Sequence, residues 1–178
     1  LFGFGYFITN IFWITIALTF DKSFQLLIPF TIIFIPGFLA LFYGLTCYFF
    51  VLLKFKKTLP SFFLFSLIFG FLEYIRGSIL TGFPWNLISY SFSNHLEILN
   101  ITSVIGTYGF NLFCISLFTS PSLLILKKKK IEVIVFITFL IITLSFFKYG
   151  SKNIEEFNKS KINKLDYKVR LIGANIGI

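Results

Sequence analysis

Charged residues are scarce in this chain of 178 residues: 13% are Asp, Glu, Lys or Arg, whereas 57% are hydrophobic. In a soluble domain about a quarter of the residues carry charge. The mean hydropathy of +0.89 corresponds to more apolar surface than a water-soluble fold of this size can cover. The composition therefore excludes a soluble single domain and predicts that lipid is the solvent for most of the chain.

The residues that build disulfide frameworks, metal sites and catalytic triads are also scarce. The two cysteines, Cys47 and Cys114, lie inside apolar runs, which favours buried roles over a disulfide framework. The single histidine, His95, has Glu97 nearby but no second set of ligands, so we expect no metal site and no cofactor. It also has no partners for a Ser-His-Asp arrangement. Methionine is absent, so we expect the natural N-terminus to lie upstream.

The charge that is present is mostly basic, with a net value of +9. One cluster contains Lys54, Lys56 and Lys57, and a second cluster covers residues 127–130. The sequence shows no soluble basic face interleaved with exposed aromatic residues, so we expect no nucleic-acid partner. The clusters are instead typical of loops that fix the orientation of membrane helices.

Five apolar stretches are each long enough to cross a bilayer, because ~20 helical residues span its hydrocarbon core of about 30 Å. These stretches lie near residues 1–20, 24–53, 60–80, 98–126 and 131–147. The sequence therefore predicts an all-α polytopic membrane bundle of about five transmembrane helices over residues 1–147.

The residues after the bundle differ in composition. Residues 148–166 are polar and rich in Lys and Asn, which indicates a linker. Residues 167–178 are apolar and β-branched, which predicts a buried β-strand. Because a lone strand is unstable, we expect the chain to stop at the entrance of a second domain.

Alternation of the five stretches places both lysine clusters on one side of the membrane, which the positive-inside rule assigns to the cytoplasm. The loop at 81–97 and the C-terminal tail are then exported, to the periplasm of a Gram-negative bacterium. The tail after Lys148 is itself rich in lysine. The orientation therefore depends on a large exported domain, since such domains translocate largely regardless of charge.

Glu73 and Arg76 form the only close acid–base pair within the first four apolar stretches, and they share one helix face because they are three residues apart. One interpretation is an interfacial ion pair that ends the span and orients the helix. The other is that Arg76 binds a lipid phosphate while Glu73 holds it in place, because a guanidinium donates in a planar fork.

The loop that follows contains Gly82-Phe83-Pro84-Trp85. Proline ends helices and stiffens the chain, and tryptophan is typical of membrane interfaces. Together these residues predict a rigid corner that walls a lipid-access cleft. The candidate lipid-binding residues are Glu73, Arg76, Gly82, Phe83, Pro84, Trp85 and Tyr90. In the fourth stretch, Gly106 and Gly109 are expected to permit tight packing, and Asn111 needs a hydrogen-bond partner.

Several segments together resemble the apolipoprotein N-acyltransferase family. They are Glu-Tyr-Ile-Arg-Gly at 73–77, Leu-Thr-Gly-Phe-Pro-Trp at 80–85, Tyr-Ser at 90–91, Gly-Thr-Tyr-Gly-Phe-Asn at 106–111, Gly-Phe-Gly at 3–5 with Trp13, and the run at 168–176. The resemblance covers nearly the whole chain, and residues 73–85 are its most specific part. The run at 168–176 resembles the strand that opens the family's α/β nitrilase-like domain, which the resemblance implies is truncated here.

The resemblance implies an inner-membrane enzyme with a periplasmic nitrilase-like domain. Such an enzyme transfers an acyl chain from a phospholipid donor to the N-terminal amine of the lipidated Cys of an apolipoprotein. The family's Cys, helped by a Glu and a Lys, takes the acyl group as a thioester before the amine attacks. Those three residues belong to the nitrilase-like domain and lie outside this chain. No catalytic role is therefore assigned here, and we expect the chain alone to be inactive.

Two other interpretations stay open. A multi-pass transporter or channel subunit would use Glu73 and Arg76 as a gating pair, although such proteins usually place polar residues near the middle of the membrane. Alternatively, the helices form a non-catalytic anchor for another exported domain.

Overall fold

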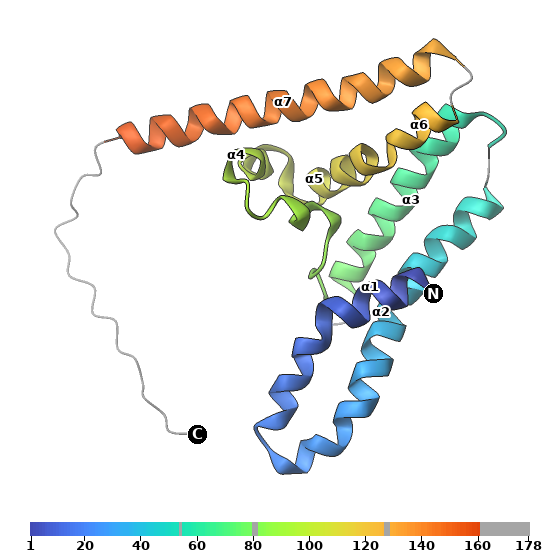
Figure 1. The fold of residues 1–178 in the computed structure, drawn as a ribbon, viewed down its shortest axis with the longest axis vertical. Coiled ribbons are helices and arrows are strands. Elements are labelled where there is room, and N and C mark those ends of the chain that lie inside the picture. The colour runs from blue at the N-terminus through green and yellow to red at the C-terminus, as the bar shows by residue number, and fades with distance from the viewer. Residues whose placement is uncertain (54, 80–81, 127–128, 161–178) are drawn as a thin grey trace.

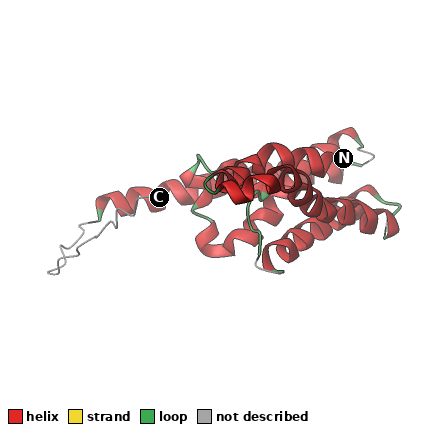
Figure 2. Cartoon of the chain, turned by 90° about the horizontal axis from the view of Figure 1, so that it is seen from below, coloured by secondary structure: helices red, strands yellow, loops and turns green. Residues whose placement is uncertain are grey.

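The computed structural model describes residues 1–53, 55–79, 82–126 and 129–160 (Figure 1). These residues are largely helical, and no strand occurs among them (Figure 2). The helices are α1 (Phe2–Ile11), η1 (Phe12–Thr19), η2 (Lys22–Leu27), α2 (Ile28–Leu52), α3 (Thr58–Ser78), η3 (Ile88–Phe92), α4 (Leu96–Leu99), α5 (Thr102–Thr119), α6 (Pro121–Ile125) and α7 (Lys130–Lys159).

Five helical segments are long and apolar enough to cross a membrane, which confirms the prediction of an all-α membrane bundle for the described residues. They are Phe2–Thr19, Lys22–Leu52, Thr58–Ser78, Thr102–Ile125 and Lys130–Lys159. The first three agree closely with the predicted stretches. The fourth begins later than predicted because the short helix α4 precedes it.

Helix α7 continues to Lys159, well past the predicted end of the fifth stretch at 147, so that much of the predicted linker is helical. Ion pairs with i,i+4 spacing support this extension: Lys152 lies 3.7 Å from Glu156, and Lys159 pairs with Glu155. Asn153 also donates a hydrogen bond of 2.7 Å to Asn100. The predicted strand at 167–178 and the last linker residues lie outside the described residues.

Helix α3 lies in the middle of the arrangement and positions the site. The first two segments form a helical hairpin, α3 runs between α2 and α5, and α7 crosses over α4 and α6 (Figure 1). At the tip of the hairpin, Asp21 accepts hydrogen bonds from the hydroxyl and N–H of Ser23, which hold the pKa of its carboxyl below the usual value. The loop after α3 faces the first hairpin, because Phe83 packs on the α1–α2 side chains and the hydroxyl of Tyr6 donates to the carbonyl of Asn86.

Two groups of buried side chains hold the helices together. Phe7, Ile11, Leu39 and Tyr43 join α1 to α2. A second group joins the loop after α3 to α5 and consists of Ile98, Ile101, Phe110 and Cys114. Side chains distant in the chain pack on both groups: Phe83 on the first and Phe146 of α7 on the second.

Two expectations about single residues need correction. Cys114 is buried as predicted, but Cys47 is exposed, since an apolar side chain of a membrane helix can face lipid instead of protein. Gly106 has no atom near its Cβ direction and has a φ of 72°, so it kinks α5 and does not serve tight packing. A Cβ on Gly109 would make only an ordinary contact with Ile105, at 3.5 Å.

Candidate functional site

Glu73 and Arg76 lie one turn apart near the end of α3, and both are buried, with exposed fractions of 0% and 2%. The Nη2 atom of Arg76 lies 3.5 Å from Oε1 of Glu73. The prediction that the two side chains share a helix face is confirmed. The pair lies inside the bundle, however, and neither side chain is exposed at its surface. Burying both charges is costly unless further hydrogen bonds satisfy them.

The carboxylate of Glu73 receives those further hydrogen bonds from two other helices. The Nδ2 atom of Asn111 on α5 donates to Oε2, and the hydroxyl of Tyr43 on α2 donates to Oε1 over 3.5 Å. Oδ1 of Asn111 in turn accepts from the N–H of Ser89, at 3.0 Å. Asn111 thus has the partners that its apolar surroundings require, and it links α3 to the loop that contains Ser89.

The guanidinium of Arg76 is only partly satisfied. Its Cζ lies 5.2 Å from the centre of the Phe7 ring, a cation–π contact. Its Nε and Nη1 atoms are buried and have no hydrogen-bond partner among the described residues. Buried polar atoms without partners are rare, and each indicates a place for a water, an ion or a ligand group. The backbone carbonyl of Arg76 accepts a hydrogen bond of 3.2 Å from the N–H of Phe83.

The turn after α3 requires glycine at position 82. Gly82 has a φ of 75°, and a Cβ there would lie 2.6 Å from the carbonyl oxygen of Gly77. Its N–H donates to the carbonyl of Ile79 at 2.8 Å. This turn directs Phe83 back onto the group formed by Phe7, Ile11, Leu39 and Tyr43. Phe83 therefore fastens the loop to the first hairpin.

Pro84 and Trp85 are exposed, and the chain from Trp85 to Ser91 lines a cavity of about 650 Å³. Such a volume lies within the range of about 300–1,000 Å³ of small-molecule sites. The ring of Trp85 lies 5.8 Å from the ring of Trp13, and the hydroxyl of Tyr6 donates to the carbonyl of Asn86 at 3.2 Å. The lining residues include Tyr6, Asn10, Trp13, Trp85, Asn86 and Tyr90.

Only two of the seven candidate residues, Trp85 and Tyr90, line this cavity. Gly82 and Phe83 shape the loop, Pro84 is exposed beside Trp85, and Glu73 and Arg76 lie deeper. Tyr6, Tyr43 and Ser89 carry no signal in the sequence that separates them from other polar residues in apolar runs. Within the described ranges, no three metal-ligating side chains come together.

Substitution of Asn111 by Leu should destabilise the protein by about 1–3 kcal/mol for each buried group that loses its partner. The groups affected are the carboxylate of Glu73 and the N–H of Ser89. Thermal unfolding in detergent would measure the change. Thr107→Ala, at an exposed position of the same helix, is the control. Equal stability of the two variants would show that Asn111 does not link α3 to the loop.

The model of the "Apolipoprotein N-acyltransferase N-terminal domain" matches residues 1–120 of this chain, which include all seven candidate residues. The chain belongs to the apolipoprotein N-acyltransferase family. The family is named for the N-acyltransferase activity of its members on apolipoproteins. Membership of this family agrees with the five apolar helices of a multi-pass membrane protein.

Relatives named apolipoprotein N-acyltransferase match along the whole chain or most of it. The protein of Rickettsia prowazekii is 33% identical over 178 residues, which are 99% of this chain and 35% of the relative. That of Rickettsia bellii is 32% identical over 177 residues, 99% of this chain and 34% of the relative. That of Rhodopseudomonas palustris is 38% identical over 127 residues, 70% of this chain and 23% of the relative.

The chain thus spans about a third of the length of the Rickettsia relatives. No solved structure gives a significant match to it.

Proposed function

We propose that this chain is the membrane portion of an enzyme that transfers an acyl chain from a phospholipid to the N-terminal amine of the lipidated Cys of apolipoproteins. The observation that carries the proposal is the aromatic cavity at Trp85, whose loop is fastened to a buried polar group on α3. The Cys nucleophile with its Glu and Lys would lie in a nitrilase-like domain outside this chain. On its own the chain is therefore expected to be inactive.

The candidate residues divide into two roles in this proposal. Trp85 and Tyr90 contact the lipid, because they line the cavity and combine apolar rings with polar tips suited to the headgroup region. Glu73 and Arg76 position the loop, through Asn111 and through the carbonyl of Arg76. The unpaired Nε and Nη1 atoms of Arg76 are the donors with which it would bind a lipid phosphate that reaches the interior.

Gly82, Phe83 and Pro84 set the path of the loop that carries Trp85. Gly82 allows the turn, and Phe83 packs on the first hairpin. Pro84 has a fixed φ and so limits the directions in which Trp85 can point. The loop is thus a preformed wall of the lipid route, and not a segment that becomes ordered when lipid binds.

We place the protein in the bacterial inner membrane, with the loop at 81–97 and the C-terminal tail in the periplasm. The loops at 54–57 and 127–130 are then cytoplasmic. Lys56, Lys57 and Lys129 line one cavity, which supports the placement of both lysine clusters on the same side of the membrane. Labelling of single cysteines introduced at Ser91 and Lys57 with a membrane-impermeant reagent would test the orientation. Labelling of position 57 from the periplasm would contradict it.

Trp85→Ala should lower the rate of acyl transfer by the complete enzyme about tenfold or more, because loss of a large aromatic contact costs roughly 1.5–3 kcal/mol. The measurement is kcat/KM with a phospholipid donor and a lipopeptide acceptor. Tyr48→Ala is the control, since Tyr48 is an exposed aromatic residue that lies on α2 and not in this cavity. Unchanged acyl transfer in both variants would indicate that the helices only anchor the enzyme in the membrane.

A further inference from the structure

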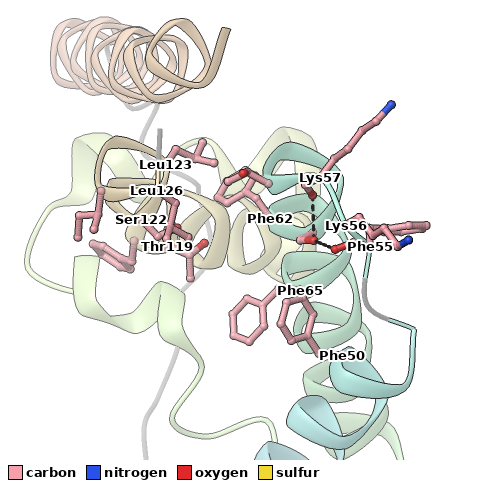
Figure 3. Close-up of a pocket in the computed structure, with 14 residues that line it drawn as sticks. Phe50, Phe55, Lys56, Lys57, Phe62, Phe65, Thr119, Ser122, Leu123 and Leu126 are labelled. Atoms are coloured by element: carbon pink, nitrogen blue, oxygen red, sulfur yellow. Dashed lines mark hydrogen bonds between the residues drawn. The ribbon is translucent and has the colours of Figure 1, made fainter. Parts of the chain in front are cut away.

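A second cavity, of about 570 Å³, lies at the other end of α3 (Figure 3). It is formed where the start of α3 faces the end of α5 and α6, whereas Glu73 and Arg76 lie near the end of α3. Phe50, Phe62 and Phe65 stand on one side, and Thr119, Ser122, Leu123 and Leu126 on the other (Figure 3). None of the seven candidate residues lines it.

The walls of this groove are mainly apolar, and its rim is exposed. Phe55, Ile125 and Leu126 at the rim are each more than half exposed, with fractions of 55%, 84% and 57%. These residues flank helices that are long and apolar enough to cross a membrane. In a bilayer the molecule that meets such a groove is phospholipid, whose acyl chain has the same apolar character as the walls.

The groove has a basic end. Lys56 and Lys57 line it and are exposed, and their side chains extend outward from the rim (Figure 3). The hydroxyl of Ser61 donates to the carbonyls of Phe55 and Lys57, at 2.9 Å each, and so fixes the lysine loop to α3. The backbone that carries the two lysines is therefore fastened to the start of α3, beside the apolar walls.

A third lysine lies close to the same end. Lys56, Lys57 and Lys129 line an adjoining cavity of about 380 Å³, together with Glu132. Glu132 accepts a hydrogen bond of 3.3 Å from the N–H of Lys129, at the start of α7. Among the described residues, none of the three lysines forms a salt bridge. Their charges are thus available to an anion at the membrane surface.

We propose that this groove binds one anionic phospholipid from the leaflet at the lysine end. One acyl chain lies between α3 and the α5–α6 segment, and the phosphate and its anionic headgroup lie against Lys56 and Lys57. A zwitterionic lipid presents its own ammonium beside the phosphate and gains less from the lysines. Phe118 borders both this groove and the cavity at Trp85, but none of the seven candidate residues lines the groove. The proposal does not depend on the acyl-transfer proposal.

Native mass spectrometry of the complete protein, titrated with phosphatidylglycerol and with phosphatidylcholine of the same acyl chains, tests the proposal. We expect phosphatidylglycerol to bind more tightly, and its affinity to fall with salt. In the double variant Lys56→Gln, Lys57→Gln its affinity should fall about 25-fold, roughly fivefold for each lysine lost near the surface. Binding of phosphatidylcholine should change little.

The control is the double variant Lys22→Gln, Lys148→Gln, which removes the same charge at exposed positions outside the groove. All four lysines are exposed, so their loss leaves the packing of the helices intact. Ser122→Phe, which fills the groove from α6, should weaken both lipids alike. Equal affinity for the two lipids, or equal loss in both double variants, would overturn the proposal. A cross-link from position 122 to a part of the complete protein outside residues 1–178 would also overturn it, because that part would then occupy the groove.

Discussion

Replacement of Glu73 by Gln is expected to destabilise the protein by about 3–5 kcal/mol, because it leaves the Arg76 guanidinium buried without its counter-charge. The carboxylate is fully buried and accepts from Tyr43 and Asn111 as well as from Arg76. Gln keeps the shape of the side chain, removes the charge and replaces one of the two acceptor oxygens with an NH2 donor. Thermal or denaturant unfolding in detergent would measure the loss.

A double-mutant cycle separates the interaction between Glu73 and Arg76 from the interactions that each side chain makes with its other neighbours. Arg76→Gln alone should also be strongly destabilising, whereas the double variant Glu73→Gln, Arg76→Gln should lose less than the sum of the two, since no charge then stays unpaired. The control is Glu155→Gln, which breaks an exposed i,i+4 pair with Lys159 and should have little effect. Additive losses in the cycle would show that the two buried charges do not depend on each other.

Gly82→Ala should displace the loop that carries Phe83 and Trp85. The positive φ of Gly82 is strained for alanine, and the new Cβ would lie 2.6 Å from a backbone oxygen of α3, which cannot move aside cheaply. We expect a loss of about 1–3 kcal/mol in stability. In the complete enzyme we expect at least a tenfold loss in acyl transfer, because a displaced wall costs about 1.4 kcal/mol or more of barrier.

The matched control for this variant is Gly44→Ala on α2. Gly44 is helical, and a Cβ there meets no atom within 4 Å. Alanine should therefore be neutral or stabilise the helix by roughly 0.5–1 kcal/mol. Suppose that Gly82→Ala transfers acyl chains at the normal rate and that the fluorescence of Trp85 still changes on addition of lipid as in the parent protein. The turn would then not be needed to shape the cavity.

The contacts between the first helical segment and the loop after α3 could not be predicted from the sequence. Nothing in the sequence pairs Tyr6 with Asn86 or Trp13 with Trp85, because these residues are far apart in the chain and sit in runs rich in similar side chains. For the same reason the sequence predicts that Asn111 has a hydrogen-bond partner but does not identify that partner. In a bundle with apolar residues on all faces, hydropathy does not indicate which face of a helix meets its neighbour.

Hydropathy and local spacing alone determined the number of spanning segments and the shared face of Glu73 and Arg76. These features depend on the length of apolar runs and on helix geometry within a few residues. Only the tertiary structure decided that the acid–base pair is buried, that Phe83 fastens the loop, and that the lysine loops end an apolar groove. Each of these depends on contacts between helices distant in the chain, which lipid as solvent leaves undetermined because it accepts apolar side chains on any face.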